Sequence, residues 1–270
     1  MDRPKRSTLG LIYFLLLAAF LYAPIILLIV FSFNNSTSLV FPLKGFTLRW
    51  YEEVVSNSTL LDAVWGSLVV GIVSSLVATA LGTVAAIGIV RYDFPGKNAF
   101  LSVAAMPLVI PSIVIGVALL ILFRQILNVE LSLWTVGLGH VVINIPVTML
   151  IVAARLAGFP DSLEEAAIDL GANYWEMLWR VTLPMSIPAL VAAFLTAFTG
   201  SFDEYAMSVF IIGTRPTLPV YIYTQLRFPS LIPRVVTLAA VLMVLSVVIL
   251  LLAEWLRRVG QTRPGSAREG

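Results

Sequence analysis

The chain has 270 residues, of which 59% are hydrophobic and 12% are charged. A soluble domain carries about 25% charged residues, so this sequence has too few to cover a water-exposed surface, and its apolar content also excludes a disordered chain. The net charge of +2 gives no indication of a nucleic-acid partner, and the lack of cysteine excludes disulfide bonds, iron–sulfur ligation and thiolate catalysis. The composition is that of an integral membrane protein.

The first apolar run covers residues 9–33 and contains no charged residue. Basic residues precede it, as in a secretory signal peptide. However, the run exceeds the roughly 7–15 residues of a signal-peptide core, and no A-x-A cleavage site follows, so we interpret it as an uncleaved membrane-spanning helix. Further runs long enough to cross a bilayer predict spans at residues 64–90, 99–123, 133–157, 183–212 and 233–255. The sequence thus predicts a single all-α integral membrane domain over residues 1–270 with six transmembrane helices.

Six spans place both termini on the same side of the membrane. Lys and Arg are more frequent in the segments on that side than in those on the other. Because positive charge accumulates in cytoplasmic loops, we expect the N- and C-termini to be cytoplasmic.

Two features inside the spans suggest helix contacts and bends. Ala78, Gly82 and Ala86 recur every four residues, and small side chains let two helix backbones approach closely. A proline removes a backbone hydrogen bond and can bend its helix. Prolines inside or at the edge of spans are Pro107, Pro111, Pro146 and Pro188.

Residues 158–182 form the only substantial loop predicted on the cytoplasmic side, and this loop is acidic. Ser162 followed three residues later by Glu165 has the pattern of a capping box and predicts the start of a helix. Gly171 is suited to the left-handed residue that ends such a helix. Residues 173–176 form a second capping pattern, so the loop is predicted to be a rigid helix–turn–helix at the membrane surface.

The same loop resembles the EAA loop of the permease subunits of ABC importers. It follows the pattern E-A-A-x3-G-x9-I-x-L-P from Glu165 through Gly171 to Pro184, with Val181 in place of isoleucine. The chain length and the order of spans also agree with this family, so the resemblance covers nearly the whole chain. It implies the fold of a type I ABC importer permease.

The resemblance further implies that the loop docks into a groove of an ATPase subunit. The residues that it assigns to this coupling are Glu164, Glu165, Ala166, Ala167, Asp169 and Gly171. It implies two copies of an ABC ATPase that bind ATP and magnesium, a second, similar permease subunit and a substrate-binding protein. The chain itself has no G-x-x-x-x-G-K-[ST] motif and no catalytic set, so we expect a non-enzymatic subunit without a cofactor, in the lipid bilayer of the bacterial inner membrane.

Several stretches resemble the polyamine-type branch of these permeases, the second permease of spermidine/putrescine importers. They are residues 31–36, 45–47, 50–51, 91–97, 166–172 and 201–204. Relatives that import 4-aminobutyrate, opines, phosphonates or ferric iron share much of this pattern and remain alternatives. A structural or enzymatic membrane subunit is the alternative from a different class.

Asp203 and Glu204 are the acidic residues predicted to lie well inside a span. Carboxylates are costly in a membrane, so they are candidates for a substrate pathway, where they would provide a counter-charge for a cationic solute. Alternatively, they lie at the outer interface, either solvated or paired with Arg215.

His140 is the only histidine, and Asn144 follows it by one helical turn. A single imidazole cannot build a metal site, so we expect an inter-helix hydrogen bond and no bound metal. Arg124 and Glu130 flank an outer turn and are interpreted as a solvated pair, with contact to a substrate-delivery protein as the alternative. Trp175 and Trp179 are expected to anchor the loop at the membrane interface.

Overall fold

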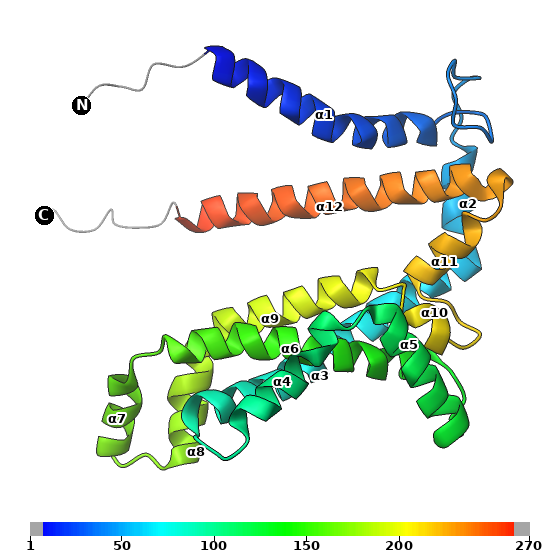
Figure 1. Cartoon of the computed structure of the whole chain (residues 1–270). Helices are drawn as coiled ribbons and strands as arrows, with labels where there is room; N and C mark the ends of the chain where they lie inside the picture. Colours follow the sequence, from blue (N-terminus) through cyan, green and yellow to red (C-terminus); the bar gives the residue numbers. More distant parts are fainter. Residues whose placement is uncertain (1–7, 262–270) are drawn as a thin grey trace, which may run out of the picture. The chain divides into compact units, whose positions relative to one another are not determined.

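The computed structural model describes residues 8–261. Within this range the regular structure is helical, apart from an isolated antiparallel bridge between Asn34 and Phe46 (Figure 1). The chain forms two compact units. Unit 1 comprises the residues up to Asn57 and those from Ile222 onward, and unit 2 comprises Ser58–Tyr221. The all-α class predicted from the sequence is confirmed.

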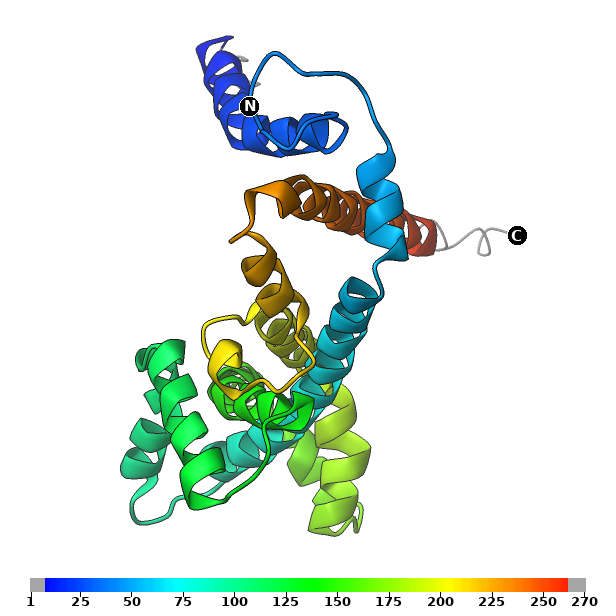
Figure 2. The same cartoon turned by 90° about the vertical axis from the view of Figure 1, so that its right-hand side faces the viewer.

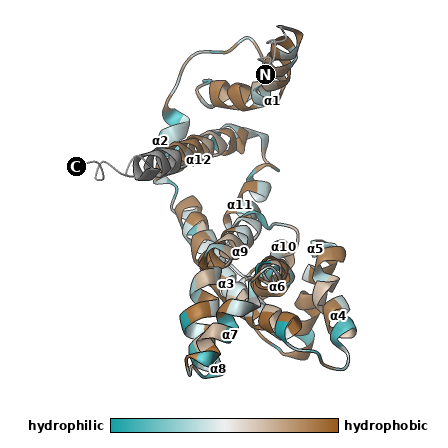
Figure 3. Cartoon of the chain, turned by 90° about the vertical axis from the view of Figure 1, so that its left-hand side faces the viewer, coloured by the Kyte–Doolittle hydropathy of each residue, from teal (hydrophilic) through white to brown (hydrophobic). Residues whose placement is uncertain are grey.

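Unit 1 is built mainly from two long apolar helices and a short amphipathic one. They are α1 (Thr8–Ser32), α12 (Ile232–Gln261) and α2 (Arg49–Ser56), with a 3₁₀ turn, η3 (Pro229–Leu231), before α12. No residue in the most apolar stretch of α1 is buried, and Figure 3 draws most of this helix in brown. A helix that is apolar on all sides and exposed in the single chain is suited to contact with lipid or with another membrane helix.

Polar contacts in unit 1 join the end of α1 to the beginning of α12. The two helices run antiparallel (Figure 1), and Thr237 Oγ1 donates a hydrogen bond to the Ser32 carbonyl at 3.3 Å. Glu53 of α2 accepts hydrogen bonds from Arg234 at 2.8 Å and from Arg49 at 2.9 Å. The polar groups are thus kept at the ends of the apolar helices, where they can reach water or one another.

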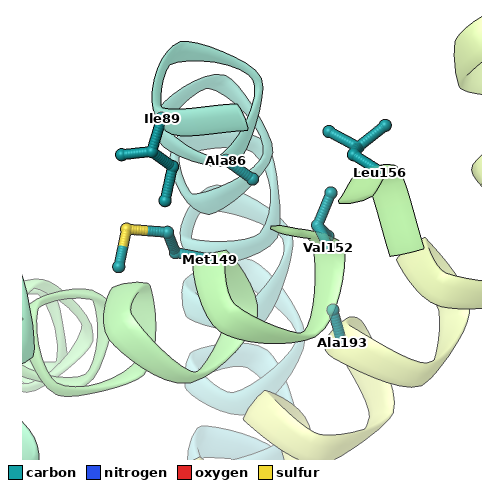
Figure 4. Packing of buried hydrophobic residues seen from close by; sticks show 6 residues of the cluster. All are labelled: Ala86, Ile89, Met149, Val152, Leu156 and Ala193. Atoms are coloured by element: carbon teal, nitrogen blue, oxygen red, sulfur yellow. The ribbon is translucent and has the colours of Figure 1, made fainter. Parts of the chain in front are cut away.

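Three helices form the core of unit 2. They are α3 (Ser58–Arg91), α6 (Leu133–Ala157) and α9 (Leu183–Asp203). α3 and α6 run parallel, and α9 runs antiparallel to both (Figure 1). Figure 4 shows one cluster of this core, in which buried side chains of all three helices meet. Its members are Ala86, Ile89, Met149, Val152, Leu156 and Ala193.

The contact between α3 and α6 depends on small residues. Ala78 and Ala86 are fully buried, and a Cβ atom added at Gly82 would clash with the Thr148 side chain and lie 2.8 Å from the Met149 backbone nitrogen. Because the backbones are so close, the Thr148 hydroxyl reaches the Ala78 carbonyl at 2.8 Å. The predicted helix contact is confirmed.

The span predicted at residues 99–123 is not one straight helix. The structure has α4 (Lys97–Val109) and α5 (Ser112–Ile121), which continues as a π-helical turn, η1 (Leu122–Ile126). The two parts are bent by 104° (Figure 1 and Figure 2). Pro111 explains the break, because proline lacks an N–H and disfavours helical geometry in the residue before it, here Ile110 with ψ 127°.

The span predicted at residues 183–212 also ends earlier than expected. α9 stops at Asp203, Glu204 is extended with ψ 112°, and a four-residue helix, α10 (Ser208–Ile211), follows before α11 (Leu218–Gln225). α10 packs closely against α5, since the Cα atom of Met207 would lie 2.9 Å from a Cβ atom added at Gly116. Among residues 8–261, five helices are long and apolar enough to cross a membrane, or six if the bent pair counts as one span.

Gly82 and Gly88 provide a matched test of the α3–α6 contact. In a free helix, Gly→Ala stabilises by up to about 1 kcal/mol. We expect Gly82→Ala instead to lower the free energy of unfolding by about 2 kcal/mol, because the added methyl overpacks the contact. Gly88→Ala, with nothing within 4 Å of its new Cβ atom, is the control and leaves stability unchanged or slightly higher. Equal unfolding temperatures of the two variants in detergent would contradict the predicted close packing of α3 and α6 at Gly82.

Glu53 predicts a pH dependence of unit 1. The hydrogen bond from Arg234 holds the pKa of the Glu53 carboxyl below its usual range, with Arg49 acting in the same direction. Its stabilising contribution is therefore present above about pH 5 and is lost as the pH falls through and below about 4. The Glu53–Arg234 ion pair is partly exposed. We therefore expect the free energy of unfolding of the wild type to exceed that of Glu53→Gln by no more than about 1 kcal/mol near neutral pH. Thermal unfolding of both proteins between about pH 3 and pH 7, on either side of the usual carboxyl pKa, measures this difference in stability. A difference that does not change with pH would refute the predicted role of Glu53.

Candidate functional site

The 158–182 loop forms two short helices at one end of unit 2, as predicted. They are α7 (Asp161–Asp169) and α8 (Tyr174–Met177), and a π-helical turn, η2 (Leu178–Thr182), leads from α8 directly into α9. Figure 1 shows α7 and α8 beyond the ends of the core helices. The loop is thus an ordered extension of α6 and α9.

The start of α7 differs from the prediction. The helix begins at Asp161, its N-cap is Pro160, and no side chain caps it. The capping box predicted at Ser162 and Glu165 is wrong, because Ser162 already lies inside the helix and cannot act as its N-cap. Pro160, with φ −66°, positions the first turn, in which the Leu163 N–H donates to the Pro160 carbonyl.

The turn between α7 and α8 is fixed from both sides. Gly171 has φ +90°, which confirms the predicted left-handed stop. The Gly171 and Ala172 N–H groups donate to the Ile168 and Ala167 carbonyls, the pair of bonds that defines a Schellman motif. On the other side, Asn173 and Glu176 exchange side-chain-to-backbone hydrogen bonds of 3.0 and 3.1 Å, so the second predicted capping box is confirmed.

One side of α7 is exposed, and we call it the α7 face. Leu170 is 90% exposed, an unusual position for leucine outside the candidate spans. Exposed apolar side chains surrounded by carboxylates are typical of a protein-binding surface. The α7 face comprises Leu163, Glu165, Ala166, Asp169 and Leu170.

Glu164 points away from the α7 face and into the protein. Its Oε1 atom accepts a hydrogen bond from Arg91 at 2.9 Å and another from Thr182 at 2.7 Å. Only 12% of the Glu164 side chain is exposed. The sequence groups Glu164 with Glu165, but the structure separates them: Glu165 is exposed, whereas Glu164 binds the rest of the unit.

A cavity of about 410 Å³ lies beside Glu164, between α7 and the ends of the core helices. Residues from each of these elements line it, among them Ile87, Arg91, Leu156, Ile168, Tyr174 and Thr182. The cavity means that apolar packing does not fill the space on this side of α7, so the polar contacts of Glu164 are important for holding the helix in place.

Asp203 and Glu204 lie at the end of α9 and not well inside a span, which corrects the prediction of their depth. Glu204 Oε1 accepts a hydrogen bond from the Met207 N–H at 2.8 Å and stabilises the turn before α10. Asp203 is exposed. In the described part of the chain neither carboxylate forms an ion pair with Arg215.

His140 is buried where α6 meets α9 and α10. Its Nδ1 atom is hydrogen-bonded to the Ser201 hydroxyl, and its Nε2 atom lies 2.9 Å from the Ser208 hydroxyl. Ser201 also contacts Ser74 of α3 at 3.1 Å. The predicted inter-helix hydrogen bond is confirmed, whereas its serine partners were not predicted. No cluster of three or more potential metal ligands occurs among the described residues.

Trp175 and Trp179 are exposed on α8 and η2, at the beginning of the candidate span Tyr174–Asp203, which is compatible with anchoring at the interface. Arg124 and Glu130 form no ion pair with each other in the described part of the chain, so their interpretation as a pair finds no support there.

Comparison with known proteins gives consistent matches. The family model described as "Binding-protein-dependent transport system inner membrane component" matches residues 78–259. The spermidine/putrescine transport system permease protein PotC of Escherichia coli (strain K12) is 35% identical over 241 residues, which cover 89% of this chain and 90% of PotC. The putrescine transport system permease protein PotI of the same organism is 34% identical over 229 residues, covering 82% of this chain and 81% of PotI.

The fold has a counterpart among solved structures. A chain of a bacterial ABC transporter involved in the import of the acidic polysaccharide alginate superposes with a TM-score of 0.68, covering 94% of this chain and 99% of that one. Its sequence identity of 17% shows a shared fold only. The family match and the identity to PotC and PotI settle the classification: this chain belongs to the family of binding-protein-dependent transport system inner membrane components.

Proposed function

We propose that this chain forms half of the translocation pathway of an ATP-driven importer and that the α7 face binds an ATPase subunit. The α7 face is the observation that carries this proposal, because it exposes Leu163 and Leu170 on an ordered helix outside the candidate spans. Carboxylates beside these apolar side chains give the surface a charge that a basic groove can recognise. In this proposal the chain is a transport subunit, and a separate ATPase subunit hydrolyses ATP.

The partners follow from the same surface and from the family. Two copies of an ABC ATPase bind ATP and magnesium, one contacting this chain and one contacting a second, similar permease subunit. A substrate-binding protein delivers the solute from the opposite side. Both termini are cytoplasmic, which places α7 and the ATPase on the same side of the inner membrane.

In this proposal, ATP binding closes the two ATPase copies and moves α7. The movement tilts the helix bundle from inward-open to outward-open, the binding protein releases its solute into the pathway, and ATP hydrolysis resets the bundle. The sequence supports this division of labour because it has no phosphate-binding loop of its own.

The proposed substrate is a polyamine such as putrescine or spermidine, the solutes in the names of PotC and PotI. α9 offers a suitable polar side: Thr196, Thr199 and Asp203 are exposed, and their spacing places them on one side of the helix. Both threonine hydroxyls donate to carbonyls of their own helix, so their oxygens can still accept from an ammonium group. Asp203 supplies the counter-charge.

Gly171→Asp tests the role of the α7 face. The variant places a side chain and a charge at a residue with φ +90°, and we expect at least a tenfold loss of ATP hydrolysis stimulated by the binding protein, on the order of 1.4 kcal/mol. Gly96→Asp is the control, because Gly96 has φ +87°, nothing within 4 Å of an added Cβ atom, and lies in the turn before α4.

The measurement uses the full complex, purified through a tag on this chain and reconstituted with its binding protein. Comparable activity of the Gly171→Asp and Gly96→Asp complexes would contradict docking through α7. If no ATPase copurifies with the wild-type chain, the proposal of an importer subunit fails as a whole.

Asp203→Asn tests the substrate side. We expect the KM for radiolabelled putrescine uptake to rise by about tenfold, the effect of losing one hydrogen bond between charged groups. Glu204→Gln is the matched control, because its amide oxygen can still accept from the Met207 N–H and preserve the turn. Uptake of 4-aminobutyrate in place of putrescine and spermidine would reject the polyamine, and equal KM values for the two variants would reject the role of Asp203.

A further inference from the structure

Three core helices of unit 2 end or begin beside α7, and each is connected to it differently. α6 continues into α7 through residues 158–160 of the chain. α3 ends at Arg91, which binds Glu164, and η2 ends at Thr182, which binds the same carboxylate directly before α9 begins. The contacts therefore bring the end of α3, 73 residues away from Glu164, and the residue directly before α9 to one side chain of α7.

A single atom makes both connections. Glu164 Oε1 accepts from the Arg91 guanidinium at 2.9 Å and from the Thr182 hydroxyl at 2.7 Å. Arg91 is 21% exposed on its side chain and Thr182 is buried, so water has limited access to the group. Hydrogen bonds to a charged acceptor in such surroundings are among the stronger polar contacts in proteins.

The surroundings increase the importance of this group. α7 contacts α8 and η2, but a cavity of about 410 Å³, lined also by α8 and η2, separates part of α7 from the ends of α3 and α6. Close packing transmits displacement between helices, and a cavity does not. At the edge of this cavity, the carboxylate of Glu164 connects α7 to Arg91 of α3 and to Thr182 of η2.

We propose that Glu164, Arg91 and Thr182 form a clamp that transmits movement of α7 to α3 and α9 together. Glu164 is a positioning residue on the inner side of α7, distinct from the α7 face that contacts the ATPase. This inference rests on the proposed function, because movement of α7 matters only if α7 is driven by a partner. Without the clamp, α7 still binds the ATPase and stays joined to α6 through the chain and to α9 through η2, but its displacement is transmitted less completely to α3 and to the beginning of α9.

The test compares variants of the clamp with a matched ion pair nearby. Glu164→Gln removes the charge and keeps the shape of the side chain, and Thr182→Val removes one donor with little change in volume. Asp93→Asn is the control: it breaks the Lys97–Asp93 pair, also 2.9 Å long, in the turn between α3 and α4, where Asp93 is 99% exposed. Like Glu164→Gln, it removes one negative charge.

We measure putrescine uptake and ATP hydrolysis together, with the full complex in proteoliposomes. Glu164→Gln is expected to lower uptake per ATP hydrolysed by about tenfold, while the ATPase still copurifies and hydrolyses ATP. Thr182→Val lowers the same ratio by a smaller factor, and Asp93→Asn leaves it unchanged. The double variant Glu164→Arg with Arg91→Glu recovers at least half of the lost ratio, because the opposite charges face each other again.

A second measurement does not depend on transport. Hydrogen exchange of the α7 amides in the full chain in nanodiscs is expected to be faster in Glu164→Gln and Thr182→Val than in wild type, and unchanged in Asp93→Asn. Wild-type uptake per ATP in Glu164→Gln and Thr182→Val, or an equal loss in Asp93→Asn, would overturn the clamp. Failure of the proposed function is distinguishable, since the wild-type complex itself would then show no ATP-driven uptake.

Discussion

Polar groups in hydrocarbon have no water to bind, and the architecture of unit 2 depends on this constraint. The Thr148 hydroxyl donates to the Ala78 carbonyl of the neighbouring helix. His140 uses both ring nitrogens, one with Ser201 and one with Ser208. The contact of Thr148 with Ala78 needs close backbones: the small residues along α3 allow the two helices to approach, and this approach provides a partner for the Thr148 hydroxyl.

The loop at residues 158–182 follows the opposite rule. There, Leu170 is exposed on the surface, whereas the charged side chain of Glu164 is turned inward and paired with Arg91. Such a reversal is unfavourable for an isolated chain in water and is reasonable where a partner covers the surface. The same short helix thus has an outer side suited to another protein and an inner side bonded to its own.

The sequence predicts well those features that depend on neighbouring residues. Gly171 and the pair Asn173 and Glu176 act within a few positions of the chain, and their conformations agree with the prediction. The separation of Glu164 from Glu165 could not be predicted, because it depends on Arg91, 73 residues away, and on Thr182, 18 residues away. The sequence also shows six apolar runs. Hydropathy alone, however, does not predict the bend at Pro111 or the end of α9 at Asp203.

The two hydrogen-bonded ends of the Gly171 turn have a consequence for assembly. Since the Schellman motif closes α7 and the Asn173–Glu176 box opens α8, the angle between these helices is set during folding of the permease itself. The loop is therefore already ordered before a partner binds, so less conformational entropy is lost on association and binding is more favourable. A preorganised surface of this kind favours rigid-body docking, in which specificity depends on shape and charge instead of induced folding.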